Sequence, residues 1–179
     1  MTKYIVFDRD GTLIKHVPYL CDPSKVELLP AVKQAIKILL DRNCKLFLHT
    51  NQSGVARGYF SLEDVNKCNM QMINLLGFGT TIFKEICVAP DFPANKISYR
   101  KPSTKFGIEI INKYKIDVKN MIYIGDSLSD IETGVNIGCK TIAVNTGLIP
   151  ISDLILRNNN INNCKVSPSL LDAVKTIIK

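Results

Sequence analysis

The stretch that decides the fold is Ile5-Val6-Phe7-Asp8-Arg9-Asp10-Gly11-Thr12-Leu13. Its apolar first residues, with Tyr4 before them, form an uninterrupted run, as is typical of a strand buried on both faces of a sheet. Asp8 and Asp10 follow where the strand should end, and ligands of open α/β sheets bind just beyond the carboxyl ends of the strands. We therefore expect the two carboxylates to converge on one pocket, where Mg²⁺, which prefers oxygen ligands, would relieve their repulsion. Taken alone, the pair fits a solvated turn equally well.

The composition is that of an ordinary globular protein. The chain has 179 residues, of which 46% are hydrophobic and 22% are charged, so we expect one domain over residues 1–179 with a substantial core. The sequence contains no apolar run near the ~20 residues of a membrane span and no signal segment ahead of the first strand. We expect a cytoplasmic protein that has no membrane contact and acts as a monomer.

The net charge of +7 fits anionic partners without saying which. Lys and Arg are scattered, apart from a loose cluster at Arg100, Lys101 and Lys105, and aromatic residues make up only 7% of the chain, with no Trp. A nucleic-acid binder usually shows a basic face with aromatic residues for stacking, so we expect a small phosphorylated substrate and no nucleic acid. The six cysteines are widely spaced, without a Cys-x-x-Cys pair, which indicates reduced thiols rather than disulfides or a metal cluster.

Apolar runs alternate with amphipathic stretches along the chain. Strands are predicted at residues 4–7, 45–50, 85–88, 121–124 and 141–144, and helices at 30–43, 62–76, 103–115, 130–137 and 169–178. Pro30, Ser61 and Ser103 mark helix starts, and Gly138 marks a helix end. Residues 15–26, 91–100 and 158–163 are predicted to be loops, the first lying over the two carboxylates. This alternation implies a doubly wound parallel sheet with helices on both faces, a three-layer α/β/α fold.

Four polar groups stand at the ends of the predicted elements: Asp8 with Asp10, Thr50 with Asn51, Lys101, and Asp126 with Asp130. Parallel strands end at one edge of a sheet, so these groups can share one site. A carboxylate nucleophile, a second carboxylate as general acid and base, a cation and a hydroxyl donor suit phosphoryl transfer with Mg²⁺. Alone, Thr50-Asn51 could be a turn, Lys101 a surface lysine and Gly125-Asp126 a strand end. All four groups in this order favour a phosphoryl-transfer site over these separate explanations.

This ordered set, Asp-x-Asp-Gly-Thr, then Thr, Lys and Gly-Asp-x-x-x-Asp, resembles the signature of the haloacid dehalogenase superfamily. The resemblance spans Asp8 to Asp130 and implies a Rossmann-like fold, without a large cap domain because no long insertion is present. It implies that Asp8 is the nucleophile, that Asp10 is the general acid and base, and that Thr50 and Lys101 hold the phosphoryl group. It also implies that Mg²⁺ is bound by Asp8, the backbone carbonyl of Asp10 and Asp126, with Asp130 behind them supporting Lys101 or the metal shell.

A narrower resemblance is to the heptose-bisphosphate phosphatases, on Asp8–Thr12, Thr50–Gly58 and Arg100-Lys101-Pro102. The histidinol phosphatases share parts of all three motifs, whereas the continuation Ser53–Gly58 favours the heptose branch. The resemblance implies hydrolysis of the C7 phosphate of D-glycero-D-manno-heptose 1,7-bisphosphate through an aspartyl-phosphate. Arg100 can form a forked contact to the second phosphate. The substrate contacts that the resemblance implies are His16, Tyr19, Thr50, Asn51, Gln52, Ser53, Arg57, Arg100 and Lys101.

The chain departs from that branch at several positions. Only Cys87 remains of the zinc clip that many members carry, with Ala89 in the place of its histidine, so no structural Zn²⁺ is expected. Ser127 replaces the usual lysine after Gly-Asp, and His16 replaces an acidic residue. These two changes bear on the substrate and not on the chemistry.

Several alternatives stay open at this point. They are a histidinol-phosphate or other small phosphomonoester phosphatase, a polynucleotide 3′-phosphatase, and a module that keeps the fold without turnover. The intact set of mutually repelling carboxylates argues against the last. His49, in a predicted buried strand, is expected to form hydrogen bonds in the core rather than to catalyse.

Overall fold

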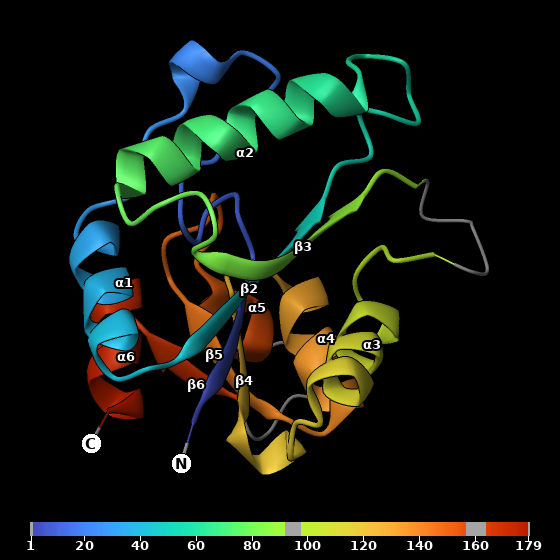
Figure 1. Ribbon diagram of the computed structural model, residues 1–179. Coiled ribbons are helices and arrows are strands. Elements are labelled where there is room, and N and C mark those ends of the chain that lie inside the picture. The colour runs from blue at the N-terminus through green and yellow to red at the C-terminus, as the bar shows by residue number, and fades with distance from the viewer. Residues whose placement is uncertain (1, 92–97, 157–163, 179) are drawn as a thin grey trace.

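A computed structural model describes residues 2–91, 98–156 and 164–178. Over these residues, six strands form one parallel sheet in the order β3-β2-β1-β4-β5-β6 (Figure 1). The strands are β1 (Tyr4–Phe7), β2 (Lys45–Asn51), β3 (Phe83–Ala89), β4 (Met121–Gly125), β5 (Lys140–Val144) and β6 (Lys165–Ser167). Val6 pairs with Phe47 on one side and with Tyr123 on the other. β1 thus lies between β2 and β4, and the predicted parallel sheet is confirmed.

Helices cover both faces of the sheet, which gives three layers (Figure 1). They are α1 (Val32–Asp41), α2 (Leu62–Leu76), α3 (Lys105–Tyr114), α4 (Leu128–Ile137), α5 (Ile151–Leu156) and α6 (Leu170–Ile177). Ile5 and Phe7 of β1 pack with α1, α2 and α6, while Val6 packs on the opposite face with α3. Ala143 of β5 packs with α4 and α5. Alternate side chains of the strands are buried on opposite faces, as expected of strands without polar alternation.

Two helices carry the end signals that the sequence shows. Ser61 and Asp64 form a reciprocal capping box at the start of α2. Gly138 ends α4 in the left-handed conformation, with φ of +81°, which glycine adopts without steric cost. The start of α2 is therefore fixed by side-chain hydrogen bonds, and the end of α4 by the backbone freedom of glycine.

Other boundaries differ from the prediction. α1 begins at Val32 rather than at Pro30, because Ala31 takes a left-handed conformation with φ of +60°. α3 begins at Lys105 rather than at 103, and α4 begins at Leu128 rather than at 130, because Ser127 caps it. Neither α5 nor β6 was predicted, since six and three residues are too few for a periodic pattern. The predicted loop at 158–163 lies outside the described residues.

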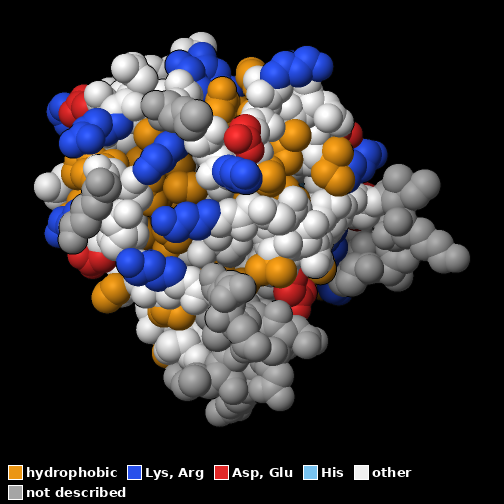
Figure 2. All heavy atoms as spheres, turned by 90° about the horizontal axis from the view of Figure 1, so that it is seen from below, with side chains coloured by type: hydrophobic (Ala, Val, Ile, Leu, Met, Phe, Trp, Pro, Cys, Tyr) orange, Lys and Arg blue, Asp and Glu red, His pale blue; other side chains and the backbone are white. Residues whose placement is uncertain are grey.

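The two termini lie near each other where the strands begin (Figure 1), and Lys3 Nζ donates a hydrogen bond to the Ile177 carbonyl there. Figure 2 shows this side of the molecule, where Lys and Arg side chains are scattered among hydrophobic and uncharged groups. The polar strand ends gather at the opposite edge of the sheet. Within the described ranges, none of the helices has the length and apolar character that a membrane span requires.

Candidate active site

The ends of three neighbouring strands bring predicted site residues together. Asp8 directly follows β1, Thr50 and Asn51 end β2, and Asp126 directly follows β4. Because β2 and β4 pair with β1 on either side, these ends meet at one edge of the sheet. Asp8 is only 7% exposed, and Thr50 is fully buried. The solvated-turn explanation therefore does not hold for Asp8.

Lys101 joins this edge from residues 98–104, which form neither helix nor strand. Its Nζ donates to Asp8 Oδ1 and to Asp130 Oδ1, each at 2.5 Å, and its side chain is 2% exposed. Burial by itself lowers the pKa of Lys101, but the carboxylates of Asp130 and Asp8 together raise it above its usual value. Lys101 is thus a buried ammonium ion between two carboxylates and not a surface lysine.

Asp8, Asp126 and Asp130 form an acidic cluster in which one carboxylate oxygen from each residue lies within 4.8 Å of those of the other two. Burial, with the charge of Asp130, raises the pKa of Asp126 to about 7. Burial also raises the pKa of Asp8 well above its usual value, although the Lys101 ammonium opposes this. With all three carboxylates ionised, the cluster and the Lys101 ammonium carry a net charge of −2, which one divalent cation would cancel. The oxygen donors and this charge fit Mg²⁺.

Two glycines leave space for Asp126. A Cβ on Gly11 would lie 2.2 Å from Asp126 Oδ2, and a Cβ on Gly147 would lie 2.1 Å from the same atom. Thr146 Oγ1 donates to the Gly11 carbonyl at 2.6 Å, which ties the turn after β5 to the turn after β1. Thr12 Oγ1 donates to Asp126 Oδ1 at 3.4 Å. A side chain at either glycine would displace the carboxylate of Asp126.

Asp10 belongs to a separate hydrogen-bond network. The fully buried Arg9 donates from Nε to Asp10 Oδ2 at 3.0 Å and from Nη2 to Asp10 Oδ1 at 3.2 Å. Its Nη1 donates to Asn69 Oδ1 at 2.9 Å. Gln52 Nε2 donates to Asp10 Oδ2 at 3.0 Å and to Thr50 Oγ1 at 2.8 Å. The guanidinium fork and the Gln52 amide fix the orientation of the Asp10 carboxylate.

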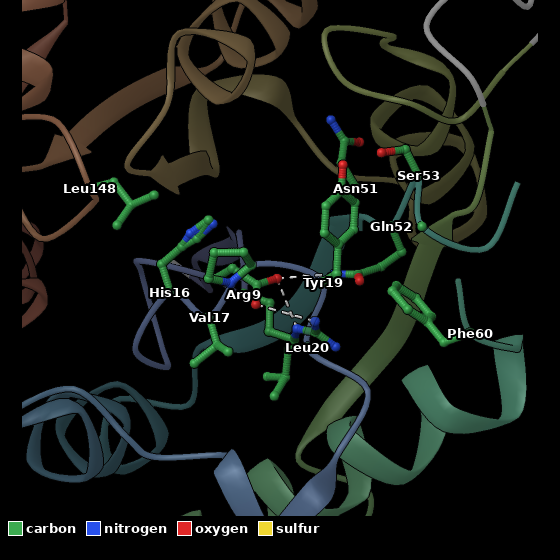
Figure 3. Close-up of a pocket in the computed structure, with 13 residues that line it drawn as sticks. Arg9, His16, Val17, Tyr19, Leu20, Asn51, Gln52, Ser53, Phe60 and Leu148 are labelled. Carbon is green, nitrogen blue, oxygen red and sulfur yellow. Dashed lines mark hydrogen bonds and ion pairs between the residues drawn. The ribbon is translucent and has the colours of Figure 1, made fainter. Parts of the chain in front are cut away.

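A pocket of about 440 Å³ lies beside Asp10 (Figure 3). Asn51, Gln52 and Ser53 line it with polar groups, and residues 16–20, from the loop predicted to lie over the carboxylates, line it as well. In Figure 3, His16 and Leu148 lie on one side and Phe60 on the other. The exposed Tyr19 packs edge-on against Tyr59, with 4.8 Å between the ring centroids. This volume is typical of a small-molecule site.

Asn51 also supports Lys101. The Lys101 backbone N–H donates to Asn51 Oδ1 at 2.9 Å, and Asn51 Nδ2 donates to the Lys101 carbonyl at 3.2 Å. An asparagine paired in this way with a backbone acts as a peptide-like bridge. The side chain of Asn51 therefore holds the segment that carries the buried ammonium, besides bordering the pocket.

Four of the predicted substrate-binding residues are not among the described residues that line the pocket: Thr50, Arg57, Arg100 and Lys101. Arg57 is exposed and Arg100 is half-buried. Burial and, next, the positive charge of Arg57 lower the pKa of Arg100, while Asp91 opposes this. The two guanidinium groups therefore stand close enough to repel each other, in segments that follow Ser53 and precede Lys101. Such a pair is suited to a multiply charged anion.

Ser127, which stands where the heptose branch usually has a lysine, has a structural role. Ser127 Oγ donates to Asp130 Oδ2 at 2.6 Å, and the Ser127 backbone N–H donates to the same oxygen at 3.0 Å. These two bonds occupy one oxygen of Asp130 and leave Oδ1 for Lys101. Ser127 thus caps α4 and orients the carboxylate behind the buried ammonium.

Comparison with known proteins fits this geometry. Residues 98–173 match a family model described as HAD-hydrolase-like. The D-glycero-beta-D-manno-heptose-1,7-bisphosphate 7-phosphatase of Bordetella bronchiseptica is 31% identical over 146 residues, which cover 81% of this chain and 82% of that protein. The chain belongs to the haloacid dehalogenase-like hydrolases.

Further relatives of this hydrolase agree. The D-glycero-D-manno-heptose-1,7-bisphosphate 7-phosphatase of Chlorobaculum tepidum is 32% identical over 158 residues, which cover 81% of this chain and 79% of that protein. The crystal structure of D,D-heptose 1,7-bisphosphate phosphatase from B. bronchiseptica, complexed with magnesium and phosphate, gives a TM-score of 0.89 at 26% identity and covers 99% of this chain and 98% of that one. As a haloacid dehalogenase-like phosphatase, the protein is a phosphoric monoester hydrolase.

Sequence reasoning missed several residues of this hydrolase's site. Arg9 lies between Asp8 and Asp10 at the end of the first strand, and an arginine between two carboxylates at such a place is a signal for an internal ion pair. Asn69 is a polar residue in the apolar stripe of α2, between the buried Val65 and Met72, which was a second signal. Phe60 and Leu148 come from irregular segments, where no pattern in the sequence marks a pocket-lining side chain.

Proposed function

We propose that this hydrolase removes the C7 phosphate of D-glycero-D-manno-heptose 1,7-bisphosphate, using Mg²⁺ and an aspartyl-phosphate formed on Asp8. The observation that carries the chemistry is the buried Lys101 ammonium, 2.5 Å from Asp8 Oδ1 and from Asp130 Oδ1, next to Asp126. This arrangement provides a nucleophile, a fixed cation and oxygen ligands at one sheet edge. The names of the relatives support the choice of sugar.

Asp8, Asp126 and the backbone carbonyl of Asp10 would hold the Mg²⁺ ion. When bound there, Mg²⁺ would offset the repulsion between Asp8 and the phosphate and stabilise charge on the phosphoryl oxygens. Asp130 acts from behind through Lys101, since its Oδ1 accepts from Nζ. The Lys101 ammonium, held between two carboxylates, stays charged and can donate to an oxygen of the transferring group.

In the first half-reaction, an oxygen of the Asp8 carboxylate attacks phosphorus, and the bond between phosphorus and the C7 oxygen breaks. The leaving oxygen takes a proton from the carboxyl group of Asp10, which borders the pocket. Arg9 and Gln52 keep that carboxyl group in one orientation. The Thr50 hydroxyl accepts from Gln52 and donates to Asp10 Oδ2 at 3.4 Å; with substrate bound, it would donate to a phosphoryl oxygen instead.

In the second half-reaction, Asp10 takes a proton from a water molecule as the water oxygen attacks the aspartyl-phosphate. The bond between phosphorus and the Asp8 oxygen breaks, inorganic phosphate leaves, and the Asp8 carboxylate is regenerated. Asp10 is then protonated again for the next turnover. Asp10 thus serves first as the acid and then as the base, and its carboxyl group can stay in one position for both steps.

The second phosphate of the substrate accounts for the paired guanidinium groups. Burial first, and the charge of Arg57 second, lower the pKa of Arg100, while Asp91 opposes this. A phosphate dianion between the two guanidinium groups would add negative charge that favours both of them. His16, Asn51 and Ser53 offer hydrogen-bonding groups along the pocket for sugar hydroxyls. Tyr19, Phe60 and Leu148 provide apolar surface for the carbon skeleton.

The test is release of phosphate in the presence of Mg²⁺ across a panel of substrates, ranked by kcat/KM. The panel contains the α and β anomers of heptose 1,7-bisphosphate, fructose 1,6-bisphosphate, histidinol phosphate and a 3′-phosphorylated oligonucleotide. We expect a heptose bisphosphate to rank first and its product to retain the C1 phosphate. A higher kcat/KM for histidinol phosphate or the oligonucleotide would overturn the assignment of the sugar. The Asp8→Asn variant, purified in parallel, controls for contaminating phosphatases.

A further inference from the structure

His49 is a fully buried histidine at the end of β2, directly before Thr50. Its Nε2 lies 2.7 Å from the Tyr99 carbonyl oxygen, and its Nδ1 lies 2.6 Å from the Tyr123 hydroxyl. A carbonyl oxygen can only accept, so Nε2 carries the proton and Nδ1 accepts from Tyr123. The imidazole also packs edge-on against Phe106, with 5.1 Å between the centroids. Both nitrogens are paired, which fixes the tautomer and the ring orientation.

The Tyr99 carbonyl lies in the segment that carries Lys101. Residues 98–104 have no strand or helix, and besides a turn in which the Ser103 N–H donates to the Arg100 carbonyl at 2.9 Å, side chains hold this backbone in place. The end of β2 provides two such supports, His49 on the carbonyl of Tyr99 and Asn51 on the backbone of Lys101. The position of the Lys101 backbone therefore depends on β2 at two points, two residues apart.

Burial and, secondarily, the charge of Lys101 lower the pKa of His49 to about 3. The ring stays neutral across the pH range in which phosphatases are assayed, and both of its nitrogens are bonded to protein groups, those of Tyr99 and Tyr123. This neutral histidine donates its Nε2 proton to the Tyr99 carbonyl and accepts at Nδ1 from Tyr123, so neither nitrogen is available to exchange a proton with a substrate. It can act only through the backbone that it holds.

We propose that His49 is a positioning residue, and that the hydrogen-bond chain from Tyr123 through His49 to the Tyr99 carbonyl aims the Lys101 ammonium at Asp8 and the phosphoryl group. The proposal rests on the phosphatase chemistry proposed above but not on the identity of the sugar. An aryl phosphate, such as p-nitrophenyl phosphate, therefore tests it even if the heptose assignment fails. The alternative is that His49 only fills space in the core.

Two conservative substitutions separate these explanations. In His49→Gln the side-chain amide nitrogen can occupy the place of Nε2 and still donate to Tyr99, whereas His49→Asn reaches only as far as Nδ1. With p-nitrophenyl phosphate and Mg²⁺, we expect His49→Asn to lower kcat by about 10- to 100-fold, the scale of a misplaced catalytic group, and His49→Gln to keep kcat within about threefold. Equal kcat values for the two variants, at any level, would overturn the proposal.

Two further measurements keep the test decisive if His49→Asn does not fold. Tyr123→Phe should lower kcat. The control is Tyr114→Phe, which loses a hydroxyl bonded to Glu85 away from Lys101 and should keep the kcat of the wild type. The same kcat in both variants would count against the hydrogen-bond chain. Long-range ¹H–¹⁵N spectra of the wild type should show His49 protonated at Nε2 alone from pH 5 to 8. A ring that titrates in this range, or that carries the proton on Nδ1, would refute the geometry.

Discussion

We predict that removing one carboxylate from the acidic cluster stabilises the metal-free protein, although most substitutions of buried residues destabilise a fold. In Asp126→Asn, an amide of the same shape replaces a carboxylate that lies near Asp8 and Asp130. The amide oxygen can still accept from Thr12 Oγ1, which bonds Asp126 Oδ1 at 3.4 Å. The substitution therefore removes charge and leaves packing nearly unchanged.

The magnitude follows from the pKa of Asp126. Burial and the charge of Asp130 raise it from 3.8 to about 7, so ionisation opposes folding. The penalty is absent below the unfolded pKa, grows as the pH rises from about 4 to about 7, and is constant above that. At roughly 1.4 kcal/mol per pKa unit the upper bound is about 4 kcal/mol, and relaxation of the site should reduce the effect to about 1–3 kcal/mol.

The assay is urea denaturation with EDTA at pH 8 and pH 4.5. We expect Asp126→Asn to exceed the wild type in free energy of unfolding by about 1–3 kcal/mol at pH 8, and by well under half of that at pH 4.5. Mg²⁺ at a thousandfold excess over its Kd should reverse the order, since it stabilises the wild type by about 4.1 kcal/mol and binds the variant more weakly. Asp41→Asn, which removes a carboxylate whose side chain is 59% exposed, is the control and should show no such pH dependence. A variant less stable than the wild type at pH 8 in EDTA would refute the reasoning.

The site makes three further predictions. Asp8→Asn should fold and show no measurable turnover of p-nitrophenyl phosphate, and Asp10→Asn should lower kcat by about 10²- to 10⁴-fold; full activity in either variant would contradict the assigned roles. Arg100→Ala should raise the KM for a sugar bisphosphate by about 10- to 100-fold, the loss of about 1.5–3 kcal/mol from a charged hydrogen bond, with no matching change for the aryl phosphate. Asn69→Ala leaves Arg9 Nη1 without its acceptor, so we expect a loss of about 1–3 kcal/mol in the free energy of unfolding and a lower kcat. An unchanged kcat would show that Arg9 orients Asp10 without the hydrogen bond to Asn69.

Much of the fold could be predicted because local patterns and tertiary structure agree. The buried run of β1 is apolar on both faces, and the capping box of α2 and the glycine after α4 are local signals that the structure repeats. The convergence of Asp8, Thr50 and Asp126 required only one further step, because parallel strands end at one edge. This prediction depends on one feature of the strand order, which is that β2 and β4 lie on either side of β1.

The rest depended on contacts between distant segments. Tyr123 and His49 are 74 positions apart, and each alone looks like an ordinary core residue of a strand. Asn69 and Arg9 meet across 60 positions, and Gly147 approaches Asp126 from the turn after β5. Periodicity predicts which side of a helix or strand a residue occupies, but not which residue of another element it contacts. These pairs therefore could not be predicted from the sequence pattern.

Burial divides the site into a part that resists change and a part that tolerates it. Lys101, Asp130 and Arg9 are buried and bonded to groups from other elements, so a substitution there leaves a buried charge unpaired and costs both stability and activity. Tyr19 and Leu148 border the same pocket, yet they are 51% and 68% exposed. Substitutions at the exposed positions can alter the contacts to a substrate while the charge balance of the buried cluster stays intact.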